Sequence, residues 1–460
     1  MMGRQVEQGA LFYEFRLEDR VPDDHLLRRV DRVLDLGFVH DVMGEHYSAI
    51  GRPSVDPVLM VRMLLVGYLY GVRSERRLCE EVDLNLAYRW FCRLGLDGRV
   101  PDHSTFTKNR HGRFRDSKLM RVVFERVVGQ CLALGIAEVR HVAVDGTHVG
   151  ASASADRFVR TADELPRDGA SRAVRDYFTD LDEAVPDLPG TTRQKPAAVS
   201  RTDPSSALST KYGKRRFAYG LNAMIDTGSG VVLDVEAAPA RTADEPEAAR
   251  RMVERTRERH GATPDVLTAD AAYGSAHFFG WGEGRGVEVH APVLNSRAGT
   301  GRRPSKDAFT YDPASDTYTC PMGKVLRRGR KHRTSAVPDG TGKAVSYFPS
   351  RRDCRACSIR ADCSPSGART IHRAPHEDAR DRAKARTGTA AFERSQRLRL
   401  RVERLFACIK HNDGLTRVRL RGRRGADEQF ALAATARNLK LMAKLLSGAP
   451  GAAPGAPRGS

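Results

Sequence analysis

The sequence predicts a protein of the α+β or α/β class, with a mixed sheet, flanking helices and an all-helical N-terminal region. Residues 22–135 carry apolar residues at helical spacing. From Val139 onward, short apolar runs alternate with helical segments, which is the pattern of a mixed sheet covered by helices. Residues 296–388 interrupt that pattern with a basic, cysteine-bearing segment rich in Gly, Ser and Pro. We therefore expect a sheet-based core with an insertion in it.

The clearest N-terminal helix begins at Asp56-Pro57, where a capping residue precedes a proline at the first helical position. Its apolar positions continue to Val72, and further helices are expected at residues 74–81 and from Asp102. The strongest apolar stretch of the chain lies here, but it is shorter than the ~18 residues that span a bilayer. The N-terminus lacks the apolar stretch of a signal peptide. We expect no membrane contact and a location in the reducing cytoplasm.

Five strands and two helices are expected in the sheet region. The strands are residues 139–144, 217–225, 231–237, 266–269 and 287–293, and the helices are residues 244–260 and 275–282. The residues that join the second and third strands, 226–230, have the Gly-rich chemistry of a hairpin. Residues 155–210 hold few apolar side chains, and we expect a long loop or a partly disordered insertion there.

The composition points to a polyanionic partner. Lys and Arg number 77 against 57 Asp and Glu, so the net charge is +20. A surplus of this size attracts polyphosphate and makes nucleic acid the leading partner, with base bias in the genome as the alternative explanation. The same ambiguity holds for the arginines of the helical region, which suit either DNA phosphate or a solvated helix face. The candidates for contact with DNA are Arg76, Arg77 and Arg110.

The chain ends in helices at residues 390–411 and 425–446, followed by a tail that has no means of burying a core. Five regions are expected from these changes of pattern. They are a helical DNA-binding domain (1–135), the first part of a sheet core (136–295), a basic cysteine-containing insertion (296–388), the C-terminal helices of the core (389–446) and a disordered tail (447–460).

Three acidic residues have the positions that metal-dependent phosphodiester chemistry needs. Asp145 and Asp270 each end a predicted strand, which holds a carboxylate rigidly on the side where ligands bind. Glu403 lies on a helix with Arg399, Phe406 and Lys410 on the same face, although an ordinary ion pair at i,i+4 spacing would give the same pattern. Three carboxylates can hold two Mg²⁺ or Mn²⁺ ions, which activate the attacking oxygen and stabilise the leaving one.

These segments together resemble the bacterial insertion-sequence transposases of the DDE type. Arg399-x3-Glu403-x6-Lys410 matches the spacing of the Tyr-x2-Arg-x3-Glu-x6-Lys signature, with Gln396 at the Tyr position. VAVDGTHV around Asp145 and LTADAAYGS around Asp270 are similar to the segments of the first two acids. SVDPVLMVRMLLVGYLYGVRSERRLCEEV and DHSTFTKNR resemble the helical domain before the core, and NLKLMAKLL resembles the final helix.

The resemblance implies an RNase H-like core that cuts at the terminal inverted repeats of an element and then transfers the strands. It implies that Asp145 bridges two metal ions, that Asp270 and Glu403 hold one each, and that Arg399 and Lys410 contact DNA phosphate near the cut. Pairing two element ends requires two active sites, so a homodimer on double-stranded DNA is expected, in the bacterial cytoplasm at the nucleoid. The alternatives are a DNA-binding protein that no longer cuts and a stand-alone nuclease; Glu393 is the next candidate for the third acid.

Four cysteines cluster in the insertion, at a spacing that suits a structural zinc site in a segment without a core of its own. They are Cys320, Cys354, Cys357 and Cys363. His332 or His372 can replace one ligand, and free thiols or an iron–sulfur cluster are the alternatives. The remaining cysteines, Cys79, Cys92, Cys131 and Cys408, follow helical apolar patterns and are expected in the core.

Overall fold

The computed structural model describes residues 15–48, 50–51, 54–182, 198–210, 213, 215–241, 244–294, 304–329, 335–336, 343–364 and 367–447. It divides into two compact units. A helical unit comprises Met1–Ile136, Ala407–Thr416 and Asp427–Ser460, and a sheet unit comprises Ala137–Phe406 and Arg417–Ala426. All but the first residue of the expected C-terminal tail lie outside the described residues.

The N-terminal part of the helical unit is built from short helices and two longer ones of 13 and 15 residues. Its helices are α1 (Leu17–Arg20), α2 (Leu26–Asp31), α3 (Val39–Met43), α4 (Pro57–Leu69), α5 (Glu75–Leu84), α6 (Leu86–Phe91), α7 (His103–Asn109), α8 (Arg115–Ser117) and α9 (Leu119–Ala133). The predicted helix starts are confirmed, since Asp56 accepts hydrogen bonds from two backbone N–H groups of α4 and Asp102 from two of α7. Most of α4 is buried, in agreement with its apolar sequence.

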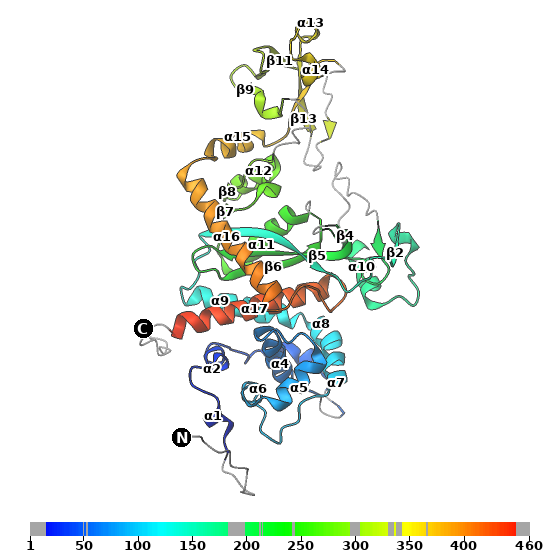
Figure 1. Ribbon diagram of the computed structural model, residues 1–460, viewed down its shortest axis with the longest axis vertical. Coiled ribbons are helices and arrows are strands. Elements are labelled where there is room, and N and C mark those ends of the chain that lie inside the picture. The colour runs from blue at the N-terminus through cyan, green and yellow to red at the C-terminus, as the bar shows by residue number, and fades with distance from the viewer. Residues whose placement is uncertain are drawn as a thin grey trace, which may run out of the picture. The chain divides into compact units, whose positions relative to one another are not determined.

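The sheet unit contains a mixed six-stranded sheet with the strand order β4-β5-β1-β7-β8 and with β6 also paired to β5 (Figure 1). The strands are β1 (His141–Gly150), β4 (Ala207–Ser209), β5 (Arg216–Asp226), β6 (Val232–Pro239), β7 (Val266–Thr268) and β8 (Glu288–His290). β1 runs antiparallel to β5 and parallel to β7, and β7 runs parallel to β8. Helix α11 (Glu245–His260) precedes β7 and α12 (Ala276–Gly284) precedes β8, which confirms the predicted order of elements.

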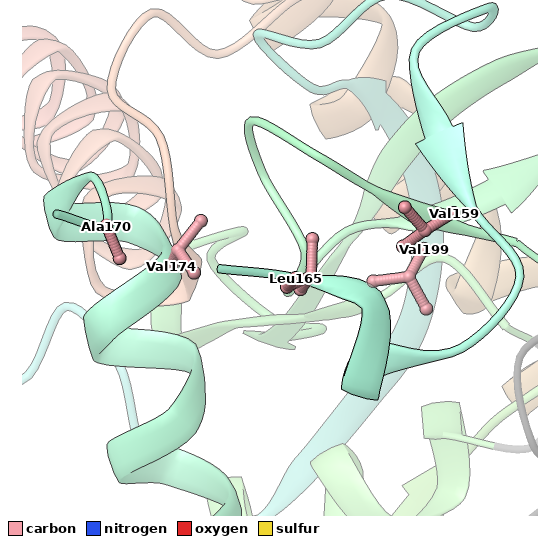
Figure 2. Close-up of a cluster of buried hydrophobic side chains, with 5 residues drawn as sticks. All are labelled: Val159, Leu165, Ala170, Val174 and Val199. Carbon is pink, nitrogen blue, oxygen red and sulfur yellow. The ribbon is translucent and has the colours of Figure 1, made fainter. Parts of the chain in front are cut away.

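Residues 155–210 contain more regular structure than the sequence predicts. β2 (Phe158–Val159) pairs with β3 (Val199–Ser200), and α10 (Arg172–Asp182) lies between them in the chain. Figure 2 shows how side chains from the strands, a turn and α10 face one another; they are Val159, Leu165, Ala170, Val174 and Val199. The prediction of a long loop is therefore wrong where these elements lie, because a few apolar residues far apart in sequence make a small core that no local period reveals.

The insertion also has a core, so the prediction that it lacks one is wrong. Its sheet has the order β12-β13-β11-β10-β9, with β14 paired to β13. The strands are β9 (Thr310–Asp312), β10 (Thr317–Thr319), β11 (Val325–Arg328), β12 (Ser335–Ala336), β13 (Lys343–Pro349) and β14 (Ile371–Arg373). Five buried residues form its centre: Phe309, Tyr318, Leu326, Tyr347 and Ile371. Three short helices complete it: α13 (Arg351–Arg355), α14 (Arg360–Cys363) and α15 (Glu377–Arg386).

Two long helices close the described chain. The first, α16, spans Ala390–His411, which are the predicted bounds, and α17 spans Arg423–Ser447, close to the predicted ones. Within the portion of the chain described here, none of the helices is long and apolar enough to cross a membrane.

Candidate active site

Asp145 lies within β1, not at its end. β1 continues to Gly150, and Asp145 stands opposite Ala223 of β5. On the other side of β1, pairing with β7 stops at Ala143, two residues before Asp145. The prediction that the strand ends on Asp145 is therefore wrong, because the long antiparallel partner extends β1 beyond its apolar run. The carboxylate is instead positioned where the parallel half of the sheet ends.

Asp270 does follow the end of its strand, as predicted. β7 ends at Thr268, and the backbone N–H of Ala269 still donates to the carbonyl of His290 at 3.1 Å. The side chain of Asp270 then accepts a hydrogen bond of 2.8 Å from the backbone N–H of Ala272, which caps the short 3-10 turn Ala271–Tyr273. The short turn after β7 thus holds the Asp270 carboxylate at the end of the sheet where the β1–β7 pairing stops.

Arg399 of α16 joins two of the predicted acids. Its Nη1 lies 3.3 Å from Oδ2 of Asp145, and its Nη2 lies 2.9 Å from Oε1 of Glu403, which is one helical turn away. The side chain of Asp145 is 14% exposed and that of Glu403 is 46% exposed. A single guanidinium group therefore links the sheet to the helix, with one of its carboxylate partners inside and the other open to water.

The electrostatics of Asp145 reflect all three acids. Burial raises the pKa of the Asp145 carboxyl to about 6, and the neighbouring Asp270 and Glu403 also raise it. The hydrogen bond from the backbone N–H of Gly146 (2.8 Å) and the charge of Arg399 act in the opposite direction. The carboxylates of Asp145, Asp270 and Glu403, which come from three separate elements, are thus electrostatic neighbours. Three neighbouring carboxylates repel one another and attract cations.

Gln396 occupies the position where the signature has a tyrosine. Its side-chain amide donates to the carbonyl of Ala269 at 3.2 Å and to the carbonyl of His290 at 2.9 Å. One residue earlier, the Ser395 hydroxyl lies 2.7 Å from Nδ1 of His290. These contacts tie the first half of α16 to the ends of β7 and β8, beside Asp270. The amide therefore positions the helix that carries Glu403.

Two residues near the acids are not among the predicted site residues. Glu245, the first residue of α11, is buried, and its carboxyl carbon lies only 3.0 Å from where a Cβ on Gly146 would stand. Tyr273 is fully buried, and its hydroxyl finds no hydrogen-bond partner among the described residues. Burial raises the pKa of Tyr273 well above 10, and Glu245, Asp145 and Asp270 raise it further. Only the fold brings Glu245 near the acids, since an acid at a helix start is common, and only the fold buries Tyr273, which follows Asp270 by three residues.

The predicted DNA-contacting residues have different surroundings. Arg76 and Arg77 are exposed on α5 and form i,i+4 ion pairs with glutamates on the same helix. Arg110 points inward, where its Nη1 lies 2.8 Å from Oε1 of Glu75 and its Nε 3.6 Å from Oε1 of Glu428. Its burial favours a structural role in place of the expected DNA contact. Lys410 belongs to the last turn of α16.

The metal-binding candidates do not form a finished site. Throughout the described ranges, no three His, Cys, Asp or Glu side chains stand together in a way that could hold a metal ion. At the acids, the guanidinium of Arg399 stands between Asp145 and Glu403. In the insertion, Cys320, Cys354, Cys357 and Cys363 are half-buried and none forms a disulfide. His332 lies outside the described residues, and Nδ1 of His372 lies 3.0 Å from the hydroxyl of Ser346.

Two family models match the chain. A transposase domain (DUF772) matches residues 15–112, which is most of the N-terminal helical region, and a transposase DDE domain matches residues 319–443. The second match includes the four cysteines of the insertion, Glu403 and both cations of the signature. No curated protein matches the chain. The two matches support an insertion-sequence transposase of the DDE type. Transposases act on DNA, and those of the DDE type generally use divalent metal ions.

Proposed function

We propose that this transposase binds the terminal inverted repeats of its element, cuts the DNA there and joins the cut strands to a target. The carboxylates of Asp145, Asp270 and Glu403 would hold two Mg²⁺ or Mn²⁺ ions. The observation that carries the proposal is the convergence of these acids, since Asp270 and Glu403 both raise the pKa of Asp145. The order β1, β5, β6, α11, β7, α12, β8 and α16 supports an RNase H-like core for this site.

The donor set suits a hard divalent cation. Carboxylate oxygens are the ligands that Mg²⁺ and Mn²⁺ prefer, and the bound metal would supply Lewis acidity and a more acidic attacking hydroxyl group. Asp145 is more buried than Glu403, and the raised pKa of its carboxyl indicates that the site tolerates further negative charge poorly without a cation. The buried hydroxyl of Tyr273, which has no hydrogen-bond partner among the described residues, would be able to donate to one of these carboxylates.

Arg399 has two tasks in this proposal. In the metal-free site it neutralises Asp145 and Glu403, to which its guanidinium is already paired. With metal bound, the two carboxylates would hold the ion instead, and the guanidinium would be available to DNA phosphate, for which its planar donors are well suited. Lys410, seven residues beyond Glu403 on the same helix, would add a second cation for the DNA backbone.

Other basic residues would bind the DNA at positions distant from the cleavage site. Arg76 and Arg77 are exposed on α5 of the matched transposase domain and would contact phosphate without reading sequence. Because an element has two ends, two copies of the chain must act together, and we propose a homodimer on DNA.

The test compares cleavage and joining of inverted-repeat DNA in Mg²⁺ by the wild type and by Asp145→Ala, Asp270→Ala and Glu403→Ala. Losing a metal ligand removes several kcal/mol of transition-state stabilisation, so rates should fall by about a thousandfold or more, while DNA binding persists. Glu393→Ala is the matched control, because Glu393 is an exposed acid at the start of the same helix.

Three other outcomes would each support a different interpretation of the protein. Loss of cleavage in Glu393→Ala but not in Glu403→Ala would reassign the third acid. Binding without cleavage by the wild type would indicate a DNA-binding protein that no longer cuts, and cleavage without joining would indicate a stand-alone nuclease.

A further inference from the structure

Four cysteines of the insertion gather beside its small core. Cys320 follows β10, Cys354 lies in α13, Cys357 follows that helix and Cys363 ends α14. Cys320 and Cys363 both pack against the core cluster that includes Tyr318, Leu326 and Tyr347. By contrast, Cys79, Cys92 and Cys131 are fully buried in the helical unit, far along the chain from this cluster. The half-buried set thus comes from two separate stretches of sequence that the fold brings together.

Backbone N–H groups point at two of these sulfur atoms. The N–H of Lys324 lies 3.3 Å from Sγ of Cys320, within a tight turn closed by a 2.8 Å bond from the N–H of Gly323 to the carbonyl of Cys320. Gly323 has φ +73°, a conformation that favours glycine. The backbone N–H of Arg369 likewise bonds to the thiol of Cys354. Such donors stabilise a thiolate and orient it, as the outer groups of a metal site do.

The four thiols are also electrostatic neighbours, since Cys357, Cys363 and Cys320 each act on Cys354. A bound divalent metal favours the ionised form of such thiols.

The segment that carries three of the cysteines, α13 and α14, has few buried contacts with the rest of the insertion. Neither α13 nor α14 contains a buried residue. The hydrophobic centre of the β9–β14 sheet is the five-residue cluster of Phe309, Tyr318, Leu326, Tyr347 and Ile371. Modules with so small a core usually need a disulfide or a metal ion to stay folded. None of the four cysteines forms a disulfide here.

We propose that Cys320, Cys354, Cys357 and Cys363 bind one structural Zn²⁺ ion, which fastens the α13–α14 segment to the β9–β14 sheet. Zinc is the divalent ion that four sulfur ligands in a tetrahedral arrangement select. Because no three such ligands are already at binding distance in the described structure, the ion must draw the thiols together. The absence of buried residues in α13 and α14 leaves that segment able to move.

The experiment measures zinc in the full-length protein by mass spectrometry, for the wild type, Cys354→Ser/Cys357→Ser and the control Cys408→Ser. We expect about one zinc per chain in the wild type and in the control, and almost none in the double variant. Cys408 is a suitable control because it is also a half-buried thiol, but it lies on α16, outside the insertion. Unchanged zinc in the double variant would overturn the proposal, as would a wild type that neither contains zinc nor takes up added Zn²⁺. Bound iron with visible absorbance would also overturn it.

A second measurement does not depend on how the variants fold. Hydrogen exchange of the wild type is followed before and after removal of metal by a chelator. Exchange should rise over residues 317–328 and 351–373 and stay constant over β1, which belongs to the same unit. Equal exchange in the insertion with and without the chelator would contradict a structural ion. Neither measurement uses DNA cleavage, so a failure here is distinct from a failure of the proposed function.

Discussion

Two arginines of this protein are each paired with two carboxylates, and they differ in what surrounds them. In the helical unit, Arg110 stands between Glu75 and Glu428 with its side chain only 4% exposed. In the sheet unit, Arg399 stands between Asp145 and Glu403, and Glu403 is 46% exposed. The first arrangement is closed to solvent and the second is open on one side.

Both arrangements hold a carboxyl group that is hard to ionise. Burial tends to raise the pKa of Glu75, but Arg110, Thr107 and His111 together more than offset it and the pKa is lowered. Burial raises the pKa of Glu428 to about 7, despite the opposing charges of Arg110 and Arg115. In the sheet unit burial raises the pKa of Asp145 to about 6. A shifted pKa alone therefore does not mark a functional site; access for a cation and a further acid, Asp270, distinguish the second one.

The largest expected effect is a loss of stability when Arg110 of the buried arrangement is replaced. Arg110→Met leaves two buried carboxylates without their cation and should lower the free energy of unfolding by about 3–5 kcal/mol, whereas Arg399→Met should cost about 1 kcal/mol or less because water reaches Glu403. Urea unfolding can follow each unit separately, with Trp90 as the probe of the helical unit and Trp281 as the probe of the sheet unit. Equal losses of unfolding free energy in the two variants would show that the surroundings of Arg110 and Arg399 do not differ in their effect on stability.

The next effect is a pH dependence of the stability of the metal-free protein, which arises from Asp145. The pKa of Asp145 rises from 3.8 to about 6 on folding, so protonation of this group stabilises the fold below about pH 4, and that contribution is lost as the pH rises through about 6. Asp145→Asn does not titrate and should gain about 3 kcal/mol relative to the wild type between pH 4 and pH 7. Urea unfolding in a chelator, read from Trp281, measures the difference. A constant difference across this range would mean that Asp145 ionises as easily in the fold as outside it.

A smaller effect concerns competition between Arg399 and the metal ion. Arg399→Gln removes a positive charge from the oxygens of Asp145 and Glu403 and should tighten Mn²⁺ binding to the DNA-free protein about tenfold, the equivalent of ~1.4 kcal/mol. Titration calorimetry gives the affinity, with Arg397→Gln as the control, since Arg397 is exposed on the same helix. Weaker Mn²⁺ binding in Arg399→Gln would show that the guanidinium supports the metal site.

The smallest effect on stability is expected at the exposed arginines. Arg76→Ala and Arg77→Ala each break only a surface ion pair, so the free energy of unfolding should change by about 0.5 kcal/mol or less. If these residues contact DNA phosphate, each variant should reduce the slope of log affinity against log salt by about 1. An unchanged slope would assign them to the solvated face of α5.

Much of the secondary structure could be predicted because its signals are local. The bounds of α16 and the starts of α4 and α7 follow from apolar spacing and capping residues that lie within one or two turns of each other. The core of residues 155–210 could not be predicted, because its five apolar side chains are spread over forty-one positions, from Val159 to Val199. The position of Asp145 within β1 was missed because the strand is extended by a partner far along the chain.

For the candidate site, the sequence by itself predicted the residues of interest: Asp145, Asp270, Glu403 and the four cysteines of the insertion. Their residue types and spacing, together with the resemblance to a known family, make them candidates, and at Glu403 an ordinary i,i+4 ion pair gives the same pattern. Only the tertiary structure decided that Arg399 pairs with two of the acids, that Glu245 lies near them, and that Arg110 and Tyr273 are buried. Burial and the distance between charges depend on contacts between segments remote in sequence, and these set how strongly each group holds its proton or attracts a cation.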